Sequence, residues 1–185
     1  MKAPDWPKCS ECQLWKYVAW HLSQNGIDCV LVGGAVASIY SQGAYRSGDL
    51  DFIIPDRQRT RVGSVLEKLG FQPTGRHFIH PDCPHLFLEF PPGPLAIGSD
   101  YRIKPESVTV HRRQVFLLSP TDCVRDRLAS YIHFKSRDTL EQALLVASSQ
   151  SVDMTEIRNW CVAEGAIPQF EEFKALLKKR HSKIQ

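Results

Sequence analysis

The chain lacks the features of a membrane, secreted or repetitive protein. No apolar run in its 185 residues approaches the length of a membrane span, and residues 1–5 contain no apolar signal segment. Internal repeats and low-complexity segments are also absent. We therefore expect a cytoplasmic protein without membrane contacts, built as one domain or as one domain with a helical appendage.

The charge balance alone identifies no partner. The formal net charge of +3 is too small to indicate nucleic-acid binding by itself. Basic residues do cluster in segments 57–61, 102–113 and 174–185. Such clusters are either solvated faces or contacts to RNA or another phosphate-bearing partner.

Residues 29–52, CVLVGGAVASIYSQGAYRSGDLDF, contain the most informative pattern in the chain. They indicate a buried strand, the glycine pair Gly33-Gly34, a short helix, and a second strand with Asp49 and Asp51. Side chains at i and i+2 of a strand point to the same face, so the two aspartates should project together. Paired carboxylates bind hard divalent cations, and glycines let backbone N–H groups approach a phosphate. The pattern therefore predicts metal-assisted chemistry on a nucleotide.

A third carboxylate is available downstream. In segment 86–90, LFLEF, the side chains alternate so that Glu89 shares a face with Phe87. An acid in an otherwise apolar strand costs free energy unless it is paired or bound to a metal. The alternative for Glu89 is a buried pair with an arginine of the hairpin predicted at 107–118. The alternative for Asp49 is that it ends a turn, and the alternative for Asp51 is that it caps a helix or pairs with an arginine.

The glycine pair and the segment 46–54, RSGDLDFII, together resemble the signature of the nucleotidyltransferase superfamily typified by DNA polymerase beta. They resemble in particular the small bacterial members of the AbiEii and minimal-nucleotidyltransferase type. Segment 119–144 is similar to the helical motif that follows the catalytic domain in the AbiEii-like branch. The resemblance covers residues 15–147. It implies an α/β (α+β) fold with a mixed-sheet nucleotidyltransferase core, flanked by helices, over residues 1–118 and a C-terminal helical region over residues 119–185.

The resemblance also implies the site residues and cofactors. The metal ligands and catalytic carboxylates would be Asp49, Asp51 and Glu89, although the family more often has Asp at the third position. They would hold two Mg²⁺ ions, or Mn²⁺ in their place, and the substrate would be a nucleoside triphosphate. Arg127 stands where the family usually has Lys, and Lys135 is its rival for the phosphate contact. The implied nucleotide-binding residues are Gly33, Gly34, Arg46, Ser47, Arg127 and Lys135.

The implied activity is transfer of NMP from an NTP to a hydroxyl acceptor, either an RNA end such as that of tRNA, a side chain of a partner protein, or a small molecule. The family resemblance suggests a place in a toxin–antitoxin or phage-defence system. One alternative is an inactive nucleotide- or RNA-binding module of the same fold. Another is a phosphohydrolase that uses the same carboxylates on water.

Cysteine and histidine residues raise a separate question of zinc binding. The segment 77–85, HFIHPDCPH, fits no common zinc-module spacing and is expected to be a polar surface loop. Cys9-x-x-Cys12 would add two ligands only if the N-terminus folds back onto this loop, and is alternatively a redox motif. Apart from Cys9 and Cys12, the four cysteines of the chain stand singly in apolar or helical surroundings, where a free thiol acts as a small hydrophobe: Cys29, Cys83, Cys123 and Cys161. The candidate zinc ligands are Cys9, Cys12, His77, His80, Cys83 and His85.

Capping and periodicity signals place the remaining elements. Ser10 and Gln13 form a capping box, and Asn25-Gly26 ends the helix that they begin. Cap-x-x-acid patterns start later helices at Ser119, Asp138 and Asp153. The expected elements are a helix over 11–24, a strand over 29–32, helices over 35–41 and 57–69, strands around a loop over 71–90, a hairpin with the turn HRRQ, and helices from 119 onward with a break at 165–168.

Overall fold

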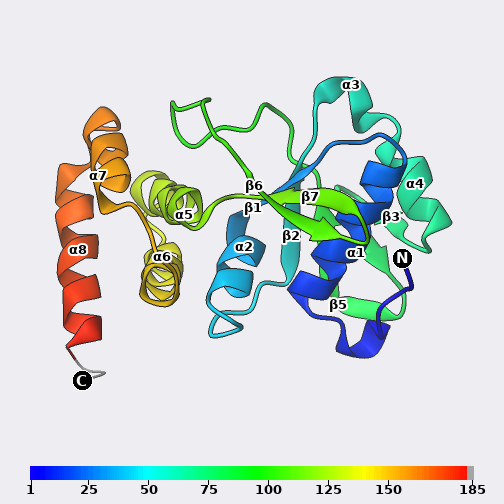
Figure 1. Cartoon of the computed structure of the whole chain (residues 1–185), viewed down its shortest axis with the longest axis horizontal. Coiled ribbons are helices and arrows are strands. Elements are labelled where there is room, and N and C mark those ends of the chain that lie inside the picture. Colours follow the sequence, from blue (N-terminus) through cyan, green and yellow to red (C-terminus); the bar gives the residue numbers. More distant parts are fainter. Residues whose placement is uncertain (183–185) are drawn as a thin grey trace.

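A computed structural model describes residues 1–182 as one mixed sheet with flanking helices (Figure 1). A short 3-10 helix, Trp6–Lys8, precedes the first α-helix. The strands are β1 (Val30–Val32), β2 (Asp49–Ile53), β3 (Gln72–Thr74), β4 (His77–His80), β5 (Cys83–Glu89), β6 (Glu106–Val110) and β7 (Arg113–Leu117). The helices are α1 (Glu11–Gln24), α2 (Gly33–Tyr40), α3 (Asp56–Arg59), α4 (Val62–Lys68), α5 (Pro120–Phe134), α6 (Arg137–Ser149), α7 (Met154–Ala163) and α8 (Ile167–His181).

The sheet confirms the expected mixed α/β architecture. Its strand order is β3-β4-β5-β2-β1-β7-β6. Strands β1 and β7 run parallel, as do β2 and β5, and the other neighbouring pairs are antiparallel. The central strands β5, β2 and β1 therefore bring segments that are far apart in the sequence to adjacent positions.

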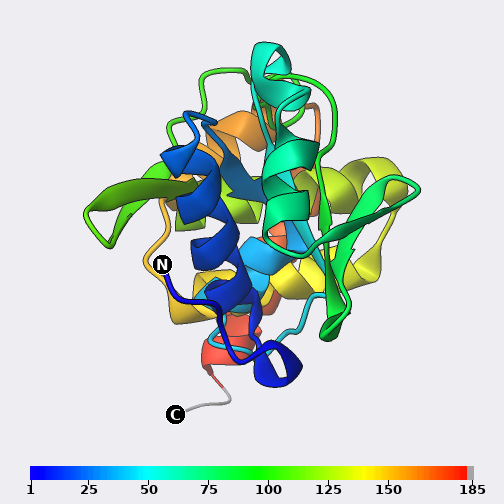
Figure 2. The ribbon, with the colours of Figure 1, turned by 90° about the vertical axis from the view of Figure 1, so that its right-hand side faces the viewer.

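Helices cover the sheet and form a group beside it. Helix α1 packs on β7 and lies next to α4 (Figure 2). Helix α2 packs on β2 and also contacts α5 and α6, which connects the sheet to the group α5–α8 (Figure 1). Within residues 1–182, no helix combines the length and apolar character that a membrane crossing needs.

Helix α1 forms where the sequence predicts it. Ser10 and Gln13 make the reciprocal capping box, which satisfies backbone donors that the first helical turn leaves free. The i, i+4, i+8 stripe of Leu14, Val18 and Leu22 is fully buried, so the helix is held by the burial of one face.

Several predictions about local structure were wrong in detail. The helix expected over 57–69 is divided into α3 and α4, and buried Gln58 at the end of the first segment bonds both the backbone N–H and the carboxylate of Asp28. The hairpin turn contains two residues, His111 and Arg112, rather than four, because Val110 pairs with Arg113. The N-cap position of helix α6 is Ser136, whose side chain makes no capping hydrogen bond, and Asp138 lies inside the first turn.

The segment 77–85 is not a surface loop. Its residues form β4, a turn at Pro81-Asp82, and the start of β5. The N-terminus does fold back onto these strands: the Trp6 ring stacks on His80 with 3.8 Å between centroids, and the His85 Nε2 atom lies 2.9 Å from the Cys9 carbonyl. This docking secures the start of α1 against the β4–β5 pair.

Candidate active site

Three carboxylates lie on two neighbouring strands at the centre of the sheet. Asp49 begins β2, and Asp51 is the direct register partner of Glu89 at the end of β5. Along β2 the alternating residues Leu50 and Phe52 are fully buried, while both aspartates are half-buried. Because cross-strand partners point to the same face, the fold brings all three acids to one side of the sheet.

The electrostatics of this group follow from its crowding. Burial, together with the negative charges of Asp49 and Glu89, raises the pKa of Asp51 to about 7, and only the Arg127 guanidinium acts in the opposite direction. Carboxylates that repel one another in this way are stabilised in their ionised forms by a bound cation.

The N-terminus of α2 faces the same carboxylates. The helix begins at Gly33, not after the glycine pair as expected, and Gly33 has a positive φ of 76°. A Cβ atom at Gly33 would lie 2.5 Å from the Asp51 Oδ2 atom, and one at Gly34 would lie 2.9 Å from the Ser47 Oγ atom. Only glycine therefore fits this close approach of backbone to the acidic strand.

A buried glutamate fixes the loop that leads into β2. The Glu11 side chain accepts hydrogen bonds from the Arg46 Nε atom at 3.0 Å and from the Ser47 backbone N–H at 2.9 Å. The Ser47 hydroxyl donates in turn to the Asp49 Oδ1 atom at 2.6 Å. Ser47 is thus engaged with the acid beside it, while the outer part of Arg46 remains exposed. Sequence reasoning missed Glu11, since an acid in the first turn of a helix signals only favourable helix-dipole electrostatics.

The two rival basic residues lie far apart, Arg127 within α5 and Lys135 just after it. The Arg127 side chain is largely buried, bonds Asp126 at 2.5 Å and Gln142 at 3.3 Å, and is close enough to Asp51 to influence its pKa. Lys135 follows the last residue of α5, where it is exposed in a left-handed conformation. The fold therefore brings Arg127 to the acids and leaves Lys135 about two helical turns further along.

Glu89 has a histidine partner rather than the arginine considered as an alternative. The His77 Nδ1 atom lies 2.7 Å from the Glu89 Oε1 atom, and the two residues are register partners across β4 and β5. This contact was missed because the strand pairing was not known, and without it His77 seemed to belong to a loop.

As placed, no group of three or more His, Cys, Asp or Glu side chains within residues 1–182 converges tightly enough to hold a metal. In the acidic site, Asp49 accepts a hydrogen bond from Ser47, whereas the His77 Nδ1 atom lies close to Glu89 without donating a hydrogen bond to it. The donors nevertheless fit a hard cation, because they are all carboxylate oxygens, and burial together with their mutual repulsion raises the pKa of Asp51. Near the N-terminus, the Cys83 Sγ atom lies 3.9 Å from the His85 ring nitrogens without completing a ligand set.

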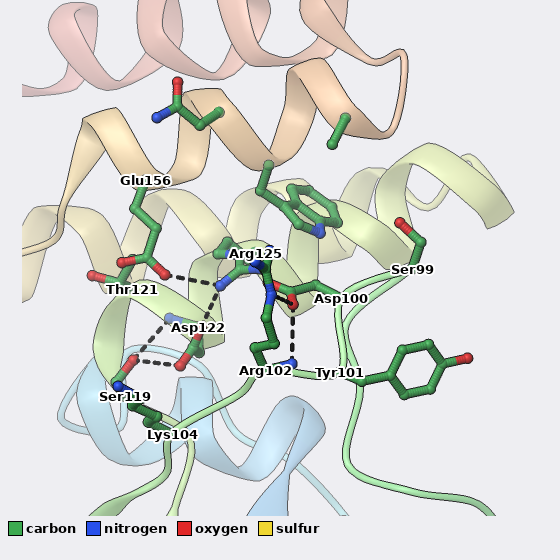
Figure 3. A pocket seen from close by; sticks show the side chains of 13 residues that line it. Ser99, Asp100, Tyr101, Arg102, Lys104, Ser119, Thr121, Asp122, Arg125 and Glu156 are labelled. Carbon is green, nitrogen blue, oxygen red and sulfur yellow. Dashed lines mark hydrogen bonds and ion pairs between the residues drawn. The ribbon is translucent and has the colours of Figure 1, made fainter.

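A cavity of about 960 Å³ lies on the other side of α5 (Figure 3). Residues 125 and 127 of this helix point roughly 160° apart, so Arg125 faces away from the acidic site. Its guanidinium bonds Asp100 at 2.6 Å, Asp122 at 2.8 Å and Glu156 at 2.9 Å. These contacts join the loop before β6 to α5 and α7, so the ion pairs of Arg125 hold the walls of this cavity together.

Comparison with solved structures identifies the fold. The chain is similar to an antigenic nucleotidyltransferase-like protein from Paracoccidioides brasiliensis, with 17% identity, a TM-score of 0.55, and coverage of 74% of this chain and 75% of the other. It is also similar to the antibiotic-resistance factor ANT(2'')-Ia in solution, with 14% identity, a TM-score of 0.52 and 94% coverage of both chains. The crystal structure of ANT(2")-Ia with adenylyl-2"-tobramycin gives 15% identity and a TM-score of 0.50, over 92% of this chain and 98% of the other.

No family model and no curated protein matches the sequence. At identities of 14–17% the structural likeness shows the fold alone. That fold is the one found in the nucleotidyltransferase superfamily, as the resemblance of the Gly-Gly and Asp-x-Asp pattern implied.

Proposed function

We propose that this chain, whose fold is that of the nucleotidyltransferases, is a metal-dependent enzyme that transfers NMP from an NTP to a hydroxyl acceptor. The observation that carries the proposal is the group of half-buried carboxylates, Asp49, Asp51 and Glu89, on adjacent strands opposite the glycine start of α2. A group of this kind is unstable by itself and is suited to a divalent cation bound with a polyphosphate.

In the proposed reaction the acceptor oxygen attacks the α-phosphorus of the NTP. The bond between the α-phosphorus and the bridging oxygen to the β-phosphate breaks, and pyrophosphate leaves. Mg²⁺ held by Asp49 and Asp51, with a second ion shared with Glu89, would neutralise the triphosphate and lower the pKa of the acceptor hydroxyl. One carboxylate accepts the hydroxyl proton.

The surrounding residues would bind and orient the triphosphate. Backbone N–H groups at Gly33 and Gly34 stand at the positive end of α2, where anions bind favourably. The free guanidinium nitrogens of Arg46 would contact phosphate oxygens while Glu11 holds its Nε atom. Arg127, beside Asp51, would offset charge on the leaving pyrophosphate, with Lys135 as the alternative.

The acceptor classes are an RNA end, a protein side chain or a small molecule, and the family resemblance adds a role in a toxin–antitoxin or defence system. A binding module without turnover is the second candidate. The complete set of three acids argues against it, because loss of catalysis removes the need to keep repelling carboxylates together.

A labelling assay tests the proposal. Purified protein is incubated with Mg²⁺, total RNA and cell extract, and with each α-³²P-labelled NTP in turn. We expect one NTP to label an RNA or protein band, and the band to disappear in Asp51→Asn but remain in Asp56→Asn, which alters an exposed aspartate. Undiminished labelling by Asp51→Asn would overturn the assignment. Absent labelling with retained Mg-NTP binding would favour the binding module.

A further inference from the structure

A second cavity, of about 620 Å³, lies on the acidic face of the sheet, beyond the acids themselves. Val30 is the register partner of both Ile53 on β2 and Phe116 on β7, so these three lining residues stand side by side on one face. Ile53 follows Asp51 by two residues, and this face is therefore the one that carries the acids. The cavity begins about 6.7 Å along β2 from Asp51.

The floor of this cavity is an apolar patch of the sheet. Val30, Ile53 and Phe116 are half-buried, so each offers part of its side chain to a ligand. Cys29 and Ile54 also border the cavity, but they are almost fully buried in the core. Small-ligand sites are commonly apolar clefts of roughly 300–1,000 Å³, a range that includes this one.

The wall opposite the floor belongs to the loop between β5 and β6. Within this loop, Ile97 and Asp100 exchange backbone hydrogen bonds at 3.0 and 3.1 Å, and Asp100 accepts from buried Arg125 at 2.6 Å (Figure 3). Leu95 packs against the core. The wall is therefore formed before a ligand arrives, which lowers the entropy lost on binding. Its lining residues are Gly93, Pro94, Leu95 and Pro105.

The charges at this cavity exclude anions. Its lining residues, all in the described part of the chain, include no Lys, Arg or His, and the charged ones are Asp28 and Asp56. The Asp28 carboxylate accepts a hydrogen bond from Gln58 at 3.2 Å. A phosphate or carboxylate would find no cation here and would be repelled by the two acids, whereas an uncharged apolar body needs neither of them.

The cavity lies on the side from which an acceptor would approach. The proposed triphosphate contacts, Gly33, Arg46 and Ser47, lie beside the acids or before the start of β2, whereas the cavity lies toward the end of β2. In an in-line displacement the attacking oxygen stands opposite the leaving group. Pyrophosphate that leaves toward α2 and Arg46 therefore requires an acceptor that enters from the side of Ile53.

We propose that this cavity is the acceptor subsite and that the acceptor is a small uncharged molecule with an apolar body and a hydroxyl group. The body lies between the floor and Leu95, and the hydroxyl points along β2 toward Asp51 and Glu89. Its oxygen forms the bond to the α-phosphorus, pyrophosphate leaves, and a carboxylate accepts the proton. The inference rests on the proposed function for the role of acceptor, but binding of an apolar alcohol is measurable without turnover.

The test is a titration of the protein with 2-(2-naphthyl)ethanol, followed by saturation-transfer NMR of the ligand. We expect a Kd of about 1 mM or below, and binding about tenfold or more weaker for 2-naphthylacetate, which has the same ring and a carboxylate. Leu95→Trp fills the cavity and should weaken binding of the alcohol about tenfold or more. Leu176→Trp, the same change at a half-buried leucine of α8 that also packs against the core, should alter it less than about twofold.

Phe116→Ala gives an independent measure, because it removes a ring from the floor instead of filling the cavity. It should weaken binding of the alcohol about fivefold. The thermal unfolding midpoint of each variant shows that it is folded. Equal affinity for the alcohol and the carboxylate, or equal effects of Leu95→Trp and Leu176→Trp, would overturn the subsite.

Manganese tests the orientation of the bound alcohol. With Mn²⁺ in place of Mg²⁺, the protons next to the hydroxyl should relax faster than the ring protons, and Asp51→Asn should abolish this difference. Faster relaxation of the ring protons, or no effect of Mn²⁺ in the wild type, would contradict the placement beside the acids.

The α-label transfer assay separates this inference from the proposed function. Transfer to an RNA end or a protein side chain, unaffected by Leu95→Trp, would refute the subsite alone. Binding of the alcohol that Leu95→Trp abolishes, without transfer to any acceptor, would refute the proposed function and leave the binding site.

Discussion

Replacing Gly33 by alanine should damage the acidic site more than the fold. The residue has φ of 76°, and a left-handed conformation costs a non-glycine residue about 1–2 kcal/mol. The new Cβ atom would also stand 2.5 Å from the Asp51 Oδ2 atom, whereas real Cβ contacts stay above 3.0 Å. The Asp51 carboxylate must therefore move by about half an ångström or more, which reaches the roughly 0.5 Å tolerance of a catalytic group.

Gly26→Ala is the matched control, because Gly26 also has a positive φ, of 64°, and apart from its own chain neighbours no atom of the described residues lies within 4 Å of its added Cβ. We expect urea unfolding to show a loss of about 1 kcal/mol in Gly26→Ala and about 2–3 kcal/mol in Gly33→Ala. In the labelling assay Gly33→Ala should lose about 100-fold in rate while Gly26→Ala stays close to wild type. If Gly33→Ala lost no more stability than Gly26→Ala and kept full activity, the close approach of Gly33 to Asp51 would be refuted.

Three further substitutions test the electrostatics of the fold and site. In metal-free buffer the pKa of Asp51 is about 7 in the folded protein, against an ordinary 3.8, so folding takes up a proton between pH 4 and 7. The free energy of unfolding of the wild type, relative to that of Asp51→Asn, should therefore fall as pH rises through that range. A constant difference between the two proteins in urea unfolding would contradict this. Arg125→Met leaves the buried carboxylate of Asp122 and the half-buried carboxylate of Asp100 without their buried cation and should lower the free energy of unfolding by about 3–5 kcal/mol. Arg102→Ala, at a 91% exposed side chain, should change it by less than about 1 kcal/mol, and similar losses in the two variants would reject the network around Arg125. Glu11→Gln keeps an acceptor for the Ser47 N–H but loses the charge facing Arg46. The KM for NTP should therefore rise roughly fivefold, or about 1 kcal/mol, with a smaller change in kcat. A larger effect on kcat than on KM would contradict a positioning role.

Local signals in the sequence predicted the elements that carry the acids. The alternation around Asp49 and Asp51 places them on one face of β2, and the alternation in segment 86–90 places Glu89 in β5. These predictions succeeded because strand alternation and helix caps depend on neighbouring residues only.

Contacts between distant segments could not be predicted in the same way. The His77–Glu89 pair depends on the register of β4 and β5, and the Glu11 contacts to residues 46 and 47 depend on where α1 packs. The segment 77–85 reads as a loop because its prolines and aspartate disfavour strands, yet the pairing of β4 with β5 and the docked N-terminus stabilise it as two strands joined by a short turn.

The most direct test of nucleotidyl transfer compares two positions of the label in one NTP. Once the labelling assay has identified the nucleotide and acceptor, the reaction is run in parallel with the α-³²P and the γ-³²P form. Our account predicts that the α-label appears on the acceptor and the γ-label in free pyrophosphate. A γ-label on the acceptor, or an α-label released as free NMP with no modified acceptor, would contradict it.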